Sequence, residues 1–108
     1  MPSRRFVYLW RYVVAEDQRA AFEQAYGPAG EWVQLFSQAE GYLETELLCE
    51  AKDGGTYLTV DTWISKEARD AFRLDFAAEF EALDRHCEKL TLEEQSLGDF
   101  YSVAEPEP

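Results

Sequence analysis

Cysteine and histidine are scarce in this sequence. Among its 108 residues there are two Cys and one His, and Cys49 and Cys87 lie far apart. Two thiols and one imidazole without short spacing cannot supply a zinc site of the Cys-x-x-Cys kind. Unclustered thiols are typical of a reducing, cytoplasmic setting, and a bridge between the two is a minor alternative.

Positive charge and long apolar runs are also lacking. Ten Lys and Arg stand against 22 Asp and Glu, which gives a net charge of −12, and only Arg4 and Arg5 are adjacent. Such a field repels nucleic acids and anionic membrane surfaces. No signal-peptide core and no apolar run of about 18 residues is present. We therefore expect a cytoplasmic protein with no nucleic-acid or membrane partner.

Aromatic side chains, by contrast, are abundant. Three Trp, six Tyr and seven Phe make up 15% of the chain. Some of these rings are expected to line a cavity or a subunit interface rather than fill the core alone. The length predicts one domain over residues 1–103, followed by a flexible tail over residues 104–108.

Three segments are rich in β-branched and aromatic residues and are predicted strands. Residues 6–14 are apolar on both faces apart from Arg11, which indicates a central strand. Residues 42–50 and 56–64 are joined by a stretch that contains Asp53-Gly54. That pair favours a hairpin turn with positive φ.

The helical signals lie between these strands. A helix opens at Glu16-Asp17, breaks at Gly27-Pro28 and resumes as a second piece that ends at Gly41. Ser65 is a predicted N-cap for the next helix. The apolar ridge of that helix comprises Ala68, Phe72, Phe76, Phe80 and Leu83.

The last part of the chain holds a capping-box pattern. Thr91 and Glu94 have the T-x-x-E spacing, which predicts a short extra helix that ends at Gly98. Residues 99–103 then form a last short strand. The order predicts an α+β, ferredoxin-like βαββαβ fold with a four-stranded antiparallel sheet and helices on one face. The open sheet face would be apolar, so we expect a homodimer in which a second copy covers it.

Several of these segments resemble one family. The segments are Val7-Tyr8-Leu9-Trp10, Phe22, Gly41-Tyr42-Leu43, Tyr57 to Trp63, Ser65-Lys66-Glu67-Ala68 and Phe72. Together they resemble the antibiotic-biosynthesis-monooxygenase domain over residues 6–103. The resemblance implies a dimeric α/β barrel, two ferredoxin-like sheets packed face to face. It also implies a range of activities: some members oxidise aromatic polyketides with O₂ and no metal or flavin, some cleave haem, and many have no known activity.

The haem-cleaving branch of the family fits poorly. Its members carry a proximal His about two helical turns beyond the position of Phe72, where this chain reads Glu79-Phe80-Glu81-Ala82. They also carry an Asn in the first strand, where this chain has aromatic residues around Trp10. His86 lies slightly later and would reach an iron only in another helix register. We expect no cofactor.

Oxygenation without a cofactor needs an aromatic pocket, a hydrogen bond to the substrate oxygen and a base. His86 is the candidate base, and the alternative is a surface or structural role. The candidate substrate contacts are aromatic: Tyr26, Trp32, Tyr57, Trp63 and Phe72. Core packing is the favoured alternative for Trp63, and packing of Trp32 against Phe36 is an equal alternative to ligand contact.

Arg11 and Asp61 carry opposite charges in the middle of two predicted neighbouring strands. The favoured interpretation is a cross-strand ion pair that sets the register, and the alternative is a polar anchor for a ligand. For the whole chain two functions remain open. One is a cofactor-independent monooxygenase of a small aromatic substrate. The other is a non-catalytic dimeric ligand-binding or structural domain, favoured by the lack of an evident acid–base couple.

Overall fold

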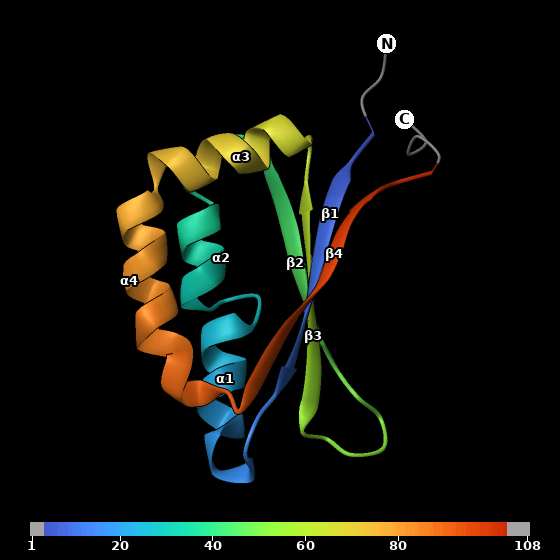
Figure 1. The fold of residues 1–108 in the computed structure, drawn as a ribbon, viewed down its shortest axis with the longest axis vertical. Helices are drawn as coiled ribbons and strands as arrows, with labels where there is room; N and C mark the ends of the chain where they lie inside the picture. The colour runs from blue at the N-terminus through green and yellow to red at the C-terminus, as the bar shows by residue number, and fades with distance from the viewer. Residues whose placement is uncertain (1–3, 104–108) are drawn as a thin grey trace.

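The chain forms one antiparallel sheet with every helix on the same side. A computed structural model describes residues 4–103 (Figure 1), so the expected tail over residues 104–108 lies outside the described residues. The sheet order is β2-β3-β1-β4. The strands are β1 (Phe6–Val13), β2 (Tyr42–Cys49), β3 (Thr56–Trp63) and β4 (Glu93–Tyr101). The predicted ferredoxin-like sheet and the central position of the first strand are confirmed.

The helices form a single layer over the sheet (Figure 1). They are η1 (Glu16–Gln18), α1 (Arg19–Tyr26), α2 (Glu31–Phe36), α3 (Lys66–Asp75), α4 (Ala77–Cys87) and η2 (Glu88–Leu90). The break at Gly27-Pro28 separates α1 from α2 as predicted. Within residues 4–103, no helix combines the length and apolarity needed to cross a membrane.

The core is aromatic and centres on Trp63, the last residue of β3. Its side chain is fully buried. Its ring lies edge-on to Phe36 and Tyr42, with ring centroids 5.9 and 5.4 Å away, and tilted against Phe72 at 5.3 Å. Ser65 begins α3 as predicted, because its hydroxyl accepts a hydrogen bond from the Ala68 backbone N–H at 3.0 Å. This cap sets the phase of α3 and turns Phe72 onto Trp63.

The single long helix predicted after Ser65 is wrong, because α3 and α4 are separate helices. Phe76 lies between them with φ −116° and ψ 26°, outside the helical region. The break changes the direction of the chain (Figure 1). Phe72 therefore packs on Trp63 while Phe80, on α4, packs edge-on against Trp32 at 5.2 Å. One straight helix could not make both of these contacts.

The extra helix predicted from Thr91 and Glu94 is also wrong. Thr91 does bond to Glu94, but through the two side chains, at 3.2 Å. The backbone instead joins β1: the Leu92 N–H donates to the Val13 carbonyl at 2.7 Å, and the pairing continues to Tyr101. A helix cap contributes only about 1 kcal/mol. Without β4, the backbone N–H and C=O groups along one edge of β1 would have no strand to pair with, which costs more. Gly98, with φ +110°, lies at the β-bulge of this strand instead of ending a helix.

The predicted ion pair between Arg11 and Asp61 is wrong as well. In the register of β1 and β3, Asp61 lies opposite Tyr8 and Arg11 lies opposite Leu58. Because side chains alternate along a strand, Asp61 points toward the helices and Arg11 toward the open face. Arg11 lies 3.7 Å from Glu93 instead, in a half-exposed ion pair.

Among residues 4–103, no layer covers the face of the sheet opposite the helices (Figure 1). The strand register places a set of apolar side chains on it: Val7, Leu9, Val13, Leu48, Leu58, Val60 and Phe100. Leu48 and Phe100 are 40% and 49% exposed. The predicted apolar open face is therefore present, with aliphatic rather than aromatic side chains over most of it.

Candidate functional site

A cavity of about 60 Å³ lies between the centre of the sheet and the helices. Every strand and each α-helix contributes to it. Its lining comprises Tyr8, Trp10, Tyr12, Tyr26, Trp32, Phe36, Thr45, Thr59, Asp61, Arg73, Phe80, Asp84 and Glu94. The wall is thus largely aromatic, and a small polar group lies along the middle of the sheet.

The aromatic wall is held by contacts between neighbouring rings. Tyr12 on β1 packs against Tyr26 with ring centroids 5.0 Å apart, and Tyr26 packs against Trp32 at 6.0 Å. Trp32 in turn contacts Phe36 at 5.8 Å and Phe80 at 5.2 Å. Tilted and edge-on arrangements of this kind are the favoured geometries of aromatic pairs. The wall therefore borders the cavity with ring faces and edges that are packed against one another.

Three lining residues have a buried polar atom that lacks a hydrogen-bond partner among the described residues. These atoms are Tyr8 Oη, Trp32 Nε1 and Thr59 Oγ1. Burial raises the pKa of Tyr8, and likewise that of Tyr12 and of Tyr26, so these phenols stay neutral and keep their O–H donors. Buried polar groups are normally paired. Unpaired ones around a cavity are suited to a ligand that carries polar atoms.

Asp61 is a buried carboxylate at the sheet floor of the cavity. It is 4% exposed and lies between Tyr8 on β1 and Thr45 on β2 in the strand register. Its Oδ1 accepts a hydrogen bond from Thr45 Oγ1 at 2.5 Å. Burial raises the pKa of Asp61 to about 6, against the lowering effects of the Thr45 hydrogen bond and of Arg73. The Asp61 carboxyl is therefore a weaker acid than an exposed Asp.

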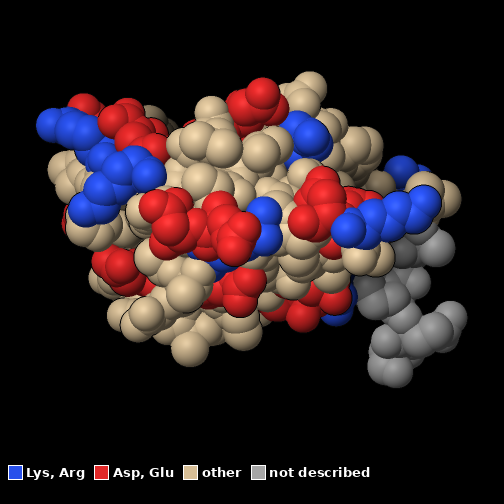
Figure 2. Space-filling view, turned by 90° about the horizontal axis from the view of Figure 1, so that it is seen from below, with Lys and Arg blue, Asp and Glu red and all other residues tan. Residues whose placement is uncertain are grey.

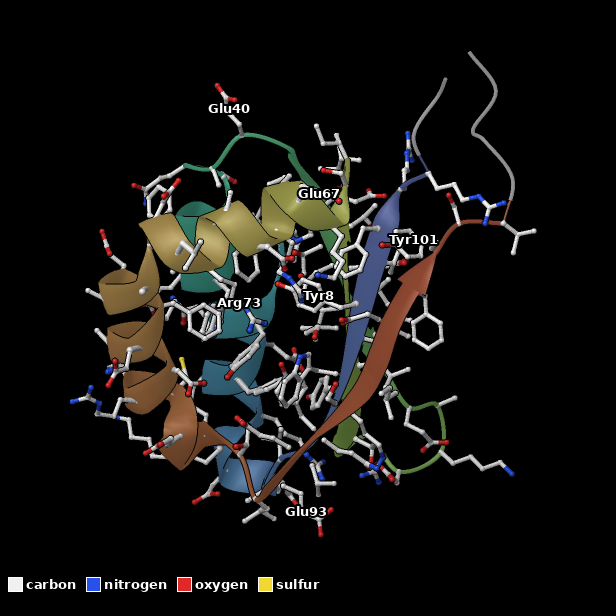
Figure 3. All side chains as sticks on the ribbon, turned by 45° about the horizontal axis from the view of Figure 1, so that its top comes forward. Tyr8, Glu40, Glu67, Arg73, Glu93 and Tyr101 are labelled. Atoms are coloured by element: carbon white, nitrogen blue, oxygen red, sulfur yellow. The ribbon has the colours of Figure 1, made fainter. Side chains whose placement is uncertain are left out.

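Charged side chains border the outer part of the cavity. Arg73 reaches from α3 toward Tyr8 (Figure 3), and its guanidinium lies 4.9 Å from the Phe80 ring centroid and 5.9 Å from that of Tyr8. Asp84 and Glu94 are exposed and also line the cavity. Acidic side chains are spread over much of the end of the molecule that Figure 2 shows. The exposed part of the cavity lining therefore carries two carboxylates and one guanidinium.

The structure brings two of the five expected substrate contacts to this cavity. Tyr26 and Trp32 line it. Trp63 and Phe72 lie in the core beyond it, and Tyr57 is buried with its hydroxyl donating to Glu23 at 2.5 Å. These three residues support the walls from behind.

His86, the expected base, lies on the outer side of α4. It is exposed and borders two open surface hollows rather than the aromatic cavity, which α4 contacts through Phe80 and Asp84. Within residues 4–103, no three His, Cys, Asp or Glu side chains cluster in a way that could hold a metal ion.

Sequence reasoning missed Tyr8, Tyr12 and Arg73 as cavity residues. A signal for the first two was present, because strand alternation places both on the face of β1 that carries Phe6. Asp61 was considered as a ligand anchor, and it shares a face with Tyr57, Thr59 and Trp63. Arg73 had no comparable signal, since its place depends on where α3 lies over the sheet.

Solved structures with the same fold include three from bacteria that are described as oxygenases. A putative antibiotic biosynthesis monooxygenase from Nitrosomonas europaea has a TM-score of 0.70 and 13% identity, and 95% of this chain and 94% of that chain are covered. One from Bordetella bronchiseptica has a TM-score of 0.71 and 18% identity, over 94% and 99% of the two chains. SnoaB from Streptomyces nogalater, described as a cofactor-independent oxygenase, has a TM-score of 0.67 and 18% identity, over 98% and 99%. At such identities the likeness concerns the fold.

The sequence itself gives the family. No curated protein matches the chain. The sequence pattern of the antibiotic biosynthesis monooxygenase family matches residues 6–74, which run from the start of β1 almost to the end of α3. This match covers more than half of the chain and includes the sheet floor of the cavity with Tyr8, Thr45 and Asp61. The chain belongs to the antibiotic biosynthesis monooxygenase family.

Proposed function

We propose that this protein is a cofactor-independent monooxygenase that binds a small aromatic molecule in the cavity and oxidises it with O₂. The observation that carries the proposal is the composition of the cavity: ring walls beside three polar atoms, Tyr8 Oη, Trp32 Nε1 and Thr59 Oγ1, that have no hydrogen-bond partner in the described part of the chain. Aromatic walls with a few placed polar groups are typical of small-molecule sites. Family membership supports the same reaction class.

The chemistry needs no electron source other than the substrate. An electron-rich phenolate or carbanion reduces O₂, one oxygen atom enters the product as a carbonyl, and the other leaves as water. The protein contributes orientation and hydrogen bonds to the oxygen on which negative charge develops. The neutral hydroxyl of Tyr8 and the indole N–H of Trp32 are donors of this kind. SnoaB, a fold relative, is described as an oxygenase that works without a cofactor.

The size of the cavity limits the substrate. A volume of about 60 Å³ is smaller than the cavity of about 150 Å³ that holds benzene in another protein. A ring therefore enters only when side chains of the lining turn outward. Arg73, Asp84 and Glu94 are the exposed members of the lining, so these are the side chains expected to move. We expect a substrate of one or two rings.

Oxygen consumption tests the proposal. The purified protein is mixed with a panel of phenols, hydroquinones and naphthols, and O₂ uptake is recorded together with quinone absorbance. Trp32→Phe is expected to lower kcat/KM by about tenfold or more, because the ring is kept and one donor is lost. Tyr57→Phe is the matched control, because it also keeps a buried ring and removes one donor, but outside the cavity lining, and it should keep its activity. An absence of O₂ uptake with every compound would contradict the proposed oxygenase activity. The alternative is then a ligand-binding domain, and calorimetry under nitrogen would detect its binding of the same compounds.

We also propose that the open sheet face binds a second copy of the chain. Seven apolar side chains from all four strands lie together on this face, and an apolar patch of that kind is rare on a monomer. Two copies of one face can cover each other across a two-fold axis. The result would be the barrel of two sheets that family resemblance implies.

A charge in the middle of the open face is expected to separate the copies. Val60 lies on β3 beside Leu9 of β1, near the centre of the apolar patch. Val60→Lys would place an ammonium group in a dry interface, so sedimentation velocity should shift from dimer to monomer. Leu74→Lys, a matched change at an 80% exposed residue on α3, should leave the dimer intact. A wild-type monomer, or a Val60→Lys dimer, would contradict the proposal.

A further inference from the structure

The two carboxylate oxygens of Asp61 differ in their hydrogen bonding. Oδ1 accepts the hydrogen bond from Thr45, and no residue among those described donates to Oδ2. The side chain lines the cavity, so Oδ2 is the oxygen left for a bound molecule. If the carboxyl only held β2 against β3, an Asn would serve equally well without burying a negative charge.

The hydrogen bonds behind Asp61 run in one direction. Thr45 Oγ1 has a single proton, which it donates to Asp61, so the Tyr42 hydroxyl must donate to Thr45, at 2.7 Å. Successive hydrogen bonds of this kind polarise one another. The hydrogen bonds from Tyr42 through Thr45 therefore hold the carboxylate in place and support its negative charge through Oδ1.

The charged and titratable groups around Asp61 come from five other elements. Tyr8 faces it from β1, Tyr42 from β2 and Arg73 from α3, while Asp84 of α4 and Glu94 of β4 line the same cavity. Burial raises the pKa of Glu94 too. The two outer carboxyls disfavour an anionic ligand. An uncharged ligand with an acidic proton fits this set of groups best.

We propose that Asp61 is the catalytic base of this cavity: its Oδ2 accepts the hydroxyl proton of an uncharged hydroxyarene, a phenol or a naphthol, whose ring lies between the aromatic walls. This inference rests on the proposed oxygenase function and names the substrate class. It also replaces His86, which lies outside the cavity, with a residue in contact with the substrate. Tyr8, the strand neighbour of Asp61, donates to the same substrate oxygen once it is charged.

The reaction balances with O₂ as the only oxidant. Asp61 takes the O–H proton, and the phenolate reduces O₂ and forms a C–O bond at a ring carbon that carries hydrogen, ortho or para to the oxygen. The proton held by Asp61 passes to the outer oxygen of the peroxide. The O–O bond then breaks as the C–H proton leaves, the C–H electron pair becomes the new C=O bond, and the departing hydroxide takes that proton to form water. A phenol and O₂ thus give a quinone and water, and Asp61 is an anion again.

Binding under nitrogen tests the acceptor without any turnover. Phenol and anisole differ by one hydroxyl proton, and calorimetry measures both affinities for the wild type, Asp61→Asn and Asp75→Asn. The wild type is expected to prefer phenol by about tenfold. Asp61→Asn should lose this preference, since the amide keeps the shape and the Thr45 bond but turns an N–H toward the ligand. Asp75→Asn, which removes an exposed carboxylate outside the cavity, should keep it.

Turnover of an oxidised panel compound tests the base. In the wild type, kcat/KM should rise with pH as Asp61 ionises, and in Asp61→Asn it should fall by about a hundredfold or more and lose that rise. If the enzyme is active and Asp61→Asn keeps both the phenol preference and the pH profile, Asp61 is not the base. The proposed oxygenase function is unaffected by that result. A wild type that shows the Asp61-dependent preference but consumes no O₂ overturns both the oxygenase and the base, and leaves Asp61 as a ligand's proton acceptor.

Discussion

Replacing Trp63 by Ala is expected to lower the free energy of unfolding by about 3–5 kcal/mol. The indole is fully buried and contacts the rings of Phe36, Tyr42 and Phe72. Removing it would leave a cavity where β3, α2 and α3 meet, and a rigid aromatic cluster closes such a space only in part. Urea denaturation followed by circular dichroism measures the loss. Domains of this size have about 5–15 kcal/mol in all, so a fraction of the variant would unfold at ordinary temperature.

The Phe variant separates packing from polarity at this position. Trp63 Nε1 has no hydrogen-bond partner among the described residues, so Trp63→Phe gives up ring volume and no hydrogen bond. Its loss should be less than half of that for Ala. A loss below about 1 kcal/mol for Trp63→Ala would contradict the central role of this residue in the core. Lost activity in Trp63→Ala would reflect unfolding and would say nothing of substrate contact.

An Asp61→Asn variant is expected to be more stable than the wild type, and the difference should depend on pH. A rise of the pKa from 3.8 to about 6 in the folded protein corresponds to about 3 kcal/mol at most. Below the unfolded pKa the Asp61 carboxyl is protonated in both states and carries no penalty. As pH rises through the folded pKa, the folded state must ionise a buried group and loses stability. The advantage of Asn should therefore be largest above about pH 7 and shrink steadily between about pH 6 and pH 4.

Asp70 provides a control, because its replacement by Asn is expected to change the stability in the opposite direction. Lys66 and Arg69 hydrogen-bond to its carboxylate and hold its pKa below the usual range. Asp70→Asn should therefore lose stability at neutral pH, and its deficit should shrink as pH falls. Urea titrations of the three proteins over a pH series give both differences. A difference between Asp61→Asn and wild type that is the same at every pH would mean that Asp61 ionises normally in the folded protein.

A stability gain on losing Asp61 would be an argument for function. Groups that lower stability are common where activity needs a strained or destabilised site, and carboxyls with a raised pKa cluster at functional sites. The neighbouring groups show the same conflict, since the buried hydroxyls of Tyr8 and Thr59 find no hydrogen-bond partner within residues 4–103. The middle of the sheet, where β1, β2 and β3 carry these groups side by side, is therefore less stable than an apolar floor would be.

Strand alternation and helix signals determined the fold of this protein from its sequence. The aromatic first strand, the Asp53-Gly54 hairpin and the Ser65 cap are local features, and local features operate without knowledge of the rest of the chain. They predicted the order of elements and the bare apolar face. The resemblance around Trp63 predicted the family. The same alternation placed Asp61 on one face with Trp63. The side of the sheet that carries Asp61 was therefore predictable from the sequence.

Only the tertiary structure decided the remaining elements and the site. The Thr91 pattern is a helix signal, yet residues 93–101 form a strand because β1 has a free edge to satisfy. The break at Phe76 exists because Phe72 and Phe80 pack on different partners. Which aromatic rings line a cavity and which fill the core depends on where α2, α3 and α4 lie over the sheet. Periodicity along one segment carries no information about how the helices are placed over the sheet. For this reason the sequence could not distinguish Tyr26 and Trp32, which line the cavity, from Tyr57 and Trp63, which do not.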